Sequence, residues 1–192
     1  MINATSLTLQ NLLTAAVADL VVPPATPPVA IIHDLQGTID VAPPRLTLFL
    51  YEVGEDPSAR NRPHRRLNVP PDYEIQRPDM ALSLKYLITP WSGDRDTDQR
   101  LLERVLRTLY DGAILAGSVL DGALAGTAEA LKVTLLPLTI EERTRIWHAV
   151  EKPYRLSVVY EVRVVPIRST AFEEQSPVSR RSLDYGELEP VP

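Results

Sequence analysis

One stretch, residues 81–110, constrains the fold more than any other, because a strand pattern passes directly into a helix pattern within it. In its first part apolar residues alternate with polar ones, as in a strand with one buried face: Leu82, Leu84, Tyr86 and Ile88. From Leu101 to Tyr110 the apolar residues recur at helical spacing instead. Asp94, Asp96 and Asp98 precede them, where negative charge favours the start of a helix. A strand and a helix that each bury one face need partners, so other segments must complete the core.

Further elements follow from the same patterns. Apolar spacing predicts an N-terminal helix over 3–20, ended by Pro23 and Pro24, and a helix over 140–149 that opens with the capping box Thr139 to Glu142. Strands are predicted at 29–32, 46–53, 131–136 and 154–167. In the last of these, one face is assigned Leu156, Val158, Tyr160, Val162 and Val164. We therefore expect an α/β (α+β) fold, with helices packed on one face of a mixed, mostly antiparallel sheet.

Size and composition bound the organisation of the chain. With 192 residues, of which 44% are hydrophobic, it can bury one core, and we expect a single domain over 1–170 and a flexible tail over 171–192. The absence of cysteine excludes disulfides and thiolate chemistry. A net charge of -5 argues against nucleic acid as a partner. Lacking a long apolar run or a signal-peptide pattern, the protein is expected to be made in the cytoplasm, without membrane insertion.

The sequence contains no recognisable catalytic or metal-binding pattern. His33, His64 and His148 lie far apart, and none has a metal-ligand partner three or four residues away. No nucleophile elbow, phosphate loop or dinucleotide fingerprint is present. Helix capping explains the carboxylate pair at 141–142, and solvation of a tail explains the pair at 173–174. We therefore predict no catalytic, cofactor or metal site, and no cofactor.

Residues 54–79 show no regular pattern and read as a long loop, which is uncommon inside a compact domain unless it is functional. Four arginines fall within seven residues of this loop: Arg60, Arg62, Arg65 and Arg66. They are compatible with a solvated loop, or with a docking surface whose guanidinium groups pair with the carboxylates of a partner.

The order of these segments resembles that of the Pvc16-type family of domains of unknown function. The resemblance rests on LTLFLYEV with the arginine-rich loop after it, LSLKYLITPW leading into DQRLLERVLRTLYD, a short helix ending in Ile146 and Trp147, and YRLSVVYEVRVV. It covers roughly residues 2–170. Some members of the family carry an additional C-terminal domain, for which this chain has only the residues after Thr170.

Members of that family are tail-terminator, or cap, proteins of contractile injection systems related to phage tails. The resemblance implies a homohexameric ring that ends polymerisation of the inner tube and the sheath, with tube protein, sheath protein and copies of itself as partners. Two other hypotheses stay open: a baseplate or tail-completion connector of the same kind of particle, and an enzyme or small-ligand module. An edge of the sheet could also accept a strand of the sheath protein, although the sequence does not indicate which edge.

Overall fold

The computed structural model describes residues 1–20, 26–61, 63–69, 72–170 and 172–175. The chain divides into two compact units. The first comprises Met1–Asn61 and Met80–Ile167, and the second comprises residues 62–79 together with those from 168 onward. In the described residues no helix combines the length and the hydropathy that crossing a membrane requires.

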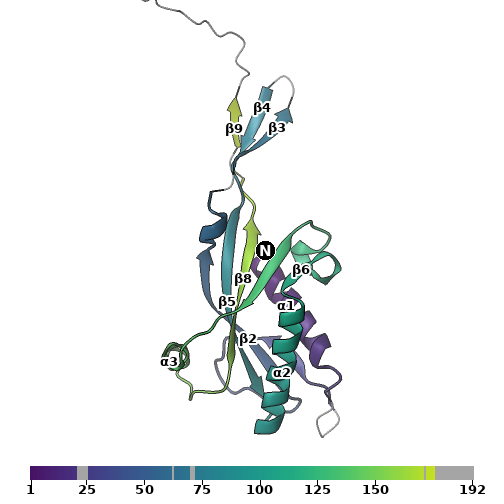
Figure 1. Ribbon diagram of the computed structural model, residues 1–192, viewed down its shortest axis with the longest axis vertical. Helices are drawn as coiled ribbons and strands as arrows, with labels where there is room; N and C mark the ends of the chain where they lie inside the picture. Colours follow the sequence, from purple (N-terminus) through teal and green to yellow (C-terminus); the bar gives the residue numbers. More distant parts are fainter. Residues whose placement is uncertain (21–25, 62, 70–71, 171, 176–192) are drawn as a thin grey trace, which may run out of the picture. The chain divides into compact units, whose positions relative to one another are not determined.

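The first unit is built on a six-stranded sheet in the order β1-β2-β5-β8-β7-β6 (Figure 1). Its strands are β1 Val29–Ile32, β2 Arg45–Glu55, β5 Met80–Trp91, β6 Ile114–Ala116, β7 Ala130–Leu135 and β8 Val158–Ile167. Only the pairing of β1 with β2 is parallel, so the sheet is mixed and mostly antiparallel, as the sequence predicts. The 81–110 stretch supplies β5, which lies between β2 and β8, and continues into α2 Arg95–Asp111.

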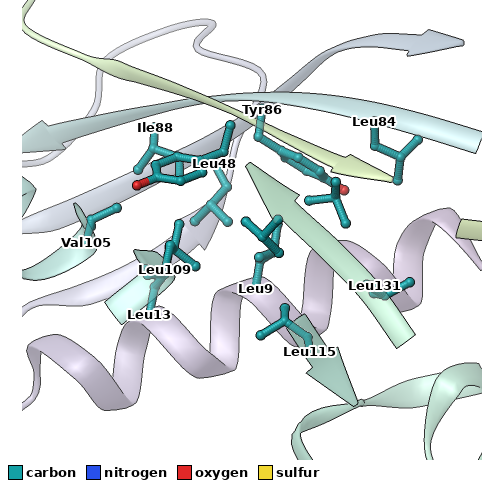
Figure 2. Packing of buried hydrophobic residues seen from close by; sticks show 14 of the residues in the cluster. Leu9, Leu13, Leu48, Leu84, Tyr86, Ile88, Val105, Leu109, Leu115 and Leu131 are labelled. Carbon is teal, nitrogen blue, oxygen red and sulfur yellow. The ribbon is translucent and has the colours of Figure 1, made fainter. Parts of the chain in front are cut away.

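Two helices cover one face of this sheet: α1 Ile2–Val17 and α2 (Figure 1). Leu9 and Leu13 of α1 are fully buried and point toward the sheet, where Leu48, Tyr86 and Ile88 meet them (Figure 2). The phenol of Tyr86 is buried in this core and shares a 2.8 Å hydrogen bond with Ser6, which satisfies both hydroxyl groups. The hydroxyl groups of Thr5 and Thr8 on the same helix donate to backbone carbonyls one turn earlier, so the buried polar side of α1 is largely paired internally.

The third helix, α3 Ile140–Ala149, packs on the opposite face of the sheet, which corrects the expectation that the helices share one face. Trp147 is 1% exposed there and contacts a second apolar cluster that includes Leu87 and Trp91 of β5. The predicted capping box between Thr139 and Glu142 is present. The reason for the two-sided arrangement lies in β5, whose even-numbered residues face α1 and α2 while Leu87 faces α3, so that both sides of this strand are buried.

Strand β8 begins later than predicted, and the residues near its end face differently from the prediction. It starts at Val158, and Leu156 is half exposed in the segment before it. The β5–β8 register shifts between Leu82 and Leu84, opposite a segment in which Val164 has a positive φ of 67°. An extra residue in one strand reverses the facing of those that follow. As a result Val165, not Val164, joins Val162 in the core.

The second unit contains a three-stranded antiparallel sheet in the order β3-β4-β9. Its strands are β3 Arg65–Val69, β4 Asp72–Gln76 and β9 Phe172–Gln175. The prediction of an irregular loop over 54–79 is therefore wrong for β3 and β4, and residues 172–175, assigned to the tail, pair with β4. Residues 176–192, the rest of the expected tail, lie outside the described residues. Two short, charged strands whose third partner comes about a hundred residues later leave little periodic signal in the sequence.

Candidate interaction surfaces

The four arginines predicted to bind a partner do not all fall in one unit. Arg60 follows the short 3₁₀ helix η1 Pro57–Ala59, is 71% exposed and lies 3.5 Å from a carboxylate oxygen of Glu55. Arg62 lies outside the described residues, while the backbones of Arg65 and Arg66 pair with Gln76 and Ile75 in the second unit. The role predicted for these arginines as a docking surface stays a prediction.

An ion pair with a buried carboxylate joins the residue after β2, Asp56, to Arg163 of β8, neither of which belongs to the arginine cluster that the sequence singles out. Asp56 is 0% exposed, and its Oδ1 accepts hydrogen bonds from Arg163 at 2.7 Å and from the backbone and hydroxyl of Ser58 at 3.0 and 2.8 Å. Its backbone N–H donates to the carbonyl of Ala81 at 2.8 Å, which ties the end of β2 to the start of β5. The other carboxylate oxygen, Oδ2, is buried without a hydrogen-bond partner.

The charge state of Asp56 follows from competing effects. Burial opposes the negative charge and would raise the pKa, but the hydrogen bonds from Arg163 and Ser58 outweigh it and hold the pKa below its ordinary value. The same contact raises the pKa of Arg163. Neither Arg163 nor Asp56 belongs to the arginine cluster predicted from the sequence. Nothing in their spacing of more than a hundred residues could have paired them.

Two further polar pairs between neighbouring strands form a row on this face of the sheet. Lys85 of β5 binds Glu52 of β2 at 2.6 Å, and Ser83 of β5 binds Glu161 of β8. Tyr51, beside this row, has its pKa raised to about 12 by burial and by the nearby carboxylates, Glu52 among them. In each pair the two polar groups bond to each other, so these groups are less available to a partner protein.

An apolar groove of about 660 Å³ lies on the face of the sheet that α1 and α2 cover, between the C-terminal half of α2 and the edge of the sheet. Its walls include Leu106 and Tyr110 of α2, and Val133, Leu135 and Tyr160 of β7 and β8. Tyr110 is 84% exposed and Leu135 is 46% exposed, although both are large and apolar. The charged residues in its lining, Glu103 and Arg107, pair with each other at 2.7 Å, so the groove carries little net charge.

The two edges of the six-stranded sheet differ in their backbone hydrogen bonding. At the β1 edge, side chains of α1 occupy the outward groups of Ala30: its N–H donates to Thr14 at 3.1 Å, and its carbonyl accepts from Gln10 at 3.1 Å. At the other edge β6 pairs only with residues 130–132 of β7, and one further bond runs from the N–H of Val133 to the carbonyl of Ala113. The edge of β7 beyond Val133 has no strand beside it in the described residues.

A smaller polar cleft of about 320 Å³ lies at the start of α2. The guanidinium of Arg155 stacks 4.3 Å from the ring centre of Trp91 and binds Asp98 at 3.1 Å, while Asp98 also accepts from the backbone and hydroxyl of Ser92. Each of these groups has its partner within the protein. These internal contacts therefore stabilise the junction between β5 and α2.

Titratable groups do not gather into a metal centre anywhere in the described residues. His33 accepts a hydrogen bond from the backbone N–H of Leu35 at 2.9 Å, which gives that histidine a local structural role. His148 lies in the last turn of α3, where a basic group suits the end of a helix.

Comparisons with known proteins agree with this fold. A solved structure described as the sheath/tube terminator of an extracellular contractile injection system, PVC, in the extended state, is similar with a TM-score of 0.67 at 18% identity, over 100% of this chain and 65% of that one. A second, described as the tube-terminating cap of the anti-feeding prophage, has a TM-score of 0.60 at 24% identity, over 95% of this chain and 59% of that one. This chain thus spans about three-fifths of the length of these two proteins. A search of curated proteins found no match. The family model of the Pvc16 N-terminal domain matches residues 4–181, so this chain belongs to the Pvc16 N-terminal domain family.

Proposed function

We propose that this protein is a structural tail terminator of a contractile injection system, which ends the polymerisation of the inner tube and the sheath at the distal end of the particle. The observation that carries the proposal is the similarity of the whole chain to two terminators, together with the family match over residues 4–181. In this role the chain acts by assembly and not by turnover, with tube and sheath subunits as its partners.

In the proposed assembly, copies of the chain form a homohexameric ring on the last layer of the tube. Arg60, Arg62, Arg65 and Arg66 then serve as an acid-binding surface toward a neighbouring copy or toward the tail. The exposure of Arg60 supports this part of the proposal, because its surface contact with Glu55 at 3.5 Å is weak and can be exchanged for another acidic partner.

The test is to assemble particles with and without this protein and to measure the length distribution and the tips of the trunks by electron microscopy. Particles that lack it should show variable length and unsealed ends. Uniform, sealed particles without the protein would refute the proposed function.

The arginine surface is tested separately with the triple change Arg60→Glu, Arg65→Glu and Arg66→Glu. Reversal of three charges should reduce incorporation into particles, whereas the control Arg145→Glu, on the outer side of α3, should not. Unchanged incorporation and trunk length in the triple variant would remove the arginines from the interface and leave the terminator role standing.

A further inference from the structure

The small sheet of the second unit has two outer strands, β3 and β9, on either side of β4 (Figure 1). In the described residues each outer strand pairs with β4 alone, so each has one edge without a neighbouring strand. Both run antiparallel to β4 and therefore parallel to each other. The chain that leads into β9 is bound to the end of β4, because the carbonyl of Ser169 accepts from Gln76 at 3.3 Å and its N–H donates to Asp79 at 3.1 Å. Such edges are ready to pair with a further strand.

The two edges of this sheet carry opposite charge. Strand β3 contains Arg65 and Arg66 and no acidic residue, whereas β9 contains Glu173 and Glu174 and no basic residue. The register places Arg66 and Glu173 in one row, on either side of Ile75. The basic residues therefore lie along one edge of the sheet and the acidic residues along the other.

These charges have no opposite charge directly across the sheet. The two arginines of β3 lie opposite neutral residues of β4, Gln76 and Ile75. Glu174 of β9 lies opposite Glu74, and like charges directly opposite each other destabilise a pair of strands. A cation on the outer side of β9 would offset this repulsion. The sheet alone therefore leaves its charges unmatched, although its two edges complement each other.

We propose that β9 of one copy of this chain pairs in parallel with β3 of a second copy, so that the acidic edge of each copy meets the basic edge of the next. In the unshifted register Arg66 lies beside Glu173. On the other face Arg65 lies one diagonal step from Glu174, a separation that long residues span. This inference rests on the proposed ring of copies and names the surface through which they join.

Charge and symmetry together select a second copy of this chain as the partner. A partner of one charge would match only one of the two edges, whereas a second copy matches both. Two-fold pairing of β3 with β3, or of β9 with β9, would be antiparallel and would bring like charges together. Pairing of β9 with β3 is head-to-tail instead, and repeated rotation closes it into a ring in which neither edge is left unpaired.

The test introduces cysteines into a chain that has none, so that every disulfide reports one contact. Asn68 of β3 and Gln175 of β9 lie in one row, on either side of Tyr73. Within one copy β4 separates them by two strand spacings, about 10 Å, which is too far for a disulfide. Between copies the proposed pairing makes them direct neighbours.

Assembled particles carrying both Asn68→Cys and Gln175→Cys should therefore give a ladder of disulfide-linked copies after oxidation, seen on a non-reducing gel. Particles carrying either change alone should give only the single chain. Absence of the ladder from the double variant would overturn the assignment. Linked dimers of this chain in a single variant would also overturn it, because they would show that like edges meet.

Charge reversal in the same two-cysteine background tests whether charge selects the pairing. Arg65→Glu with Arg66→Glu makes both edges acidic, and Glu173→Arg with Glu174→Arg makes both edges basic. Each double reversal alone should lower the yield of linked copies roughly tenfold. A mixture of the two should restore the yield, because the acidic edges of one variant then meet the basic edges of the other. Undiminished yields from the separate variants, or no recovery in the mixture, would refute the charge argument.

Failure of this inference is distinguishable from failure of the proposed function. Uniform, sealed particles that contain the two-cysteine protein but no disulfide between copies would refute the pairing of β9 with β3 alone. The terminator role is tested separately, by the length and the tips of particles that lack the protein.

Discussion

Replacing Arg163 with Met tests whether the Asp56–Arg163 pair, which links the end of β2 to β8, stabilises the fold. The change leaves a fully buried carboxylate without the guanidinium that lies 2.7 Å from it, and its Oδ2 has no other hydrogen-bond partner to compensate. Breaking a buried ion pair costs about 3–5 kcal/mol, and because Arg163 is itself one-third exposed we expect about 3 kcal/mol. Chemical denaturation gives this number as the loss in the free energy of unfolding.

The pH dependence of stability in the same variant provides a second, independent test of this ion pair. In the wild type the pKa of Asp56 is lower in the folded state, so the pair contributes stability above the ordinary carboxyl pKa, and the contribution is lost as the pH falls through the folded value. In Arg163→Met the hydrogen bond and the charge of Arg163, which lower the pKa of Asp56, are lost, so this pKa should be higher in the folded variant than in the folded wild type. The stability of the variant should therefore fall less than that of the wild type as the pH falls through the ordinary carboxyl range.

The control is Arg145→Met, which removes an equally short 2.7 Å contact with Glu141 between two largely exposed side chains. It should change the free energy of unfolding by less than about 0.5 kcal/mol. The argument from burial would be refuted if Arg163→Met cost no more than this control. Asp56→Asn keeps an acceptor for Ser58 and removes the charge, so it should cost less than Arg163→Met, and the double variant less than the sum of the two.

Three further predictions address the core. Trp147→Ala should cost about 3–5 kcal/mol in unfolding free energy by emptying the cluster under α3, and a loss below about 1 kcal/mol would show that this cluster is not tightly packed. Val164→Gly should raise the unfolding free energy by up to about 1 kcal/mol, because glycine adopts the positive φ of 67° without the steric cost that valine bears, and a clear destabilisation would mean that the side chain matters more than the backbone. Burial raises the pKa of Tyr86 to about 12, so stability from this group is fully present below pH 10 and is lost as the pH rises toward 12. Ultraviolet titration should show delayed phenolates, Tyr51 and Tyr86 among them, and Tyr86→Phe should remove one of these; an unchanged titration curve in that variant would contradict the assignment.

Local patterns were sufficient for most elements of the first unit. The 81–110 stretch predicts β5 and α2 because its apolar period changes from two to helical spacing, and the box from Thr139 to Glu142 predicts the start of α3. The order of segments also indicates the family, which the match over residues 4–181 confirms. Each of these signals lies within a short stretch of chain, where one residue's neighbours determine its conformation.

What the sequence alone determined is therefore most local elements of the first unit, the apolar face of β5 and the family. Only the tertiary structure decided that α3 covers the second face, that a register shift places Val165 and not Val164 in the core, and that β4 pairs with both β3 and β9. It also decided that Asp56 meets Arg163, and that among the described residues Leu135 has a strand on one side only, β8, while the outward groups of Ala30 are bound by α1. The physical reason is the same in each case: these features depend on contacts between residues distant in the chain, which no local period encodes.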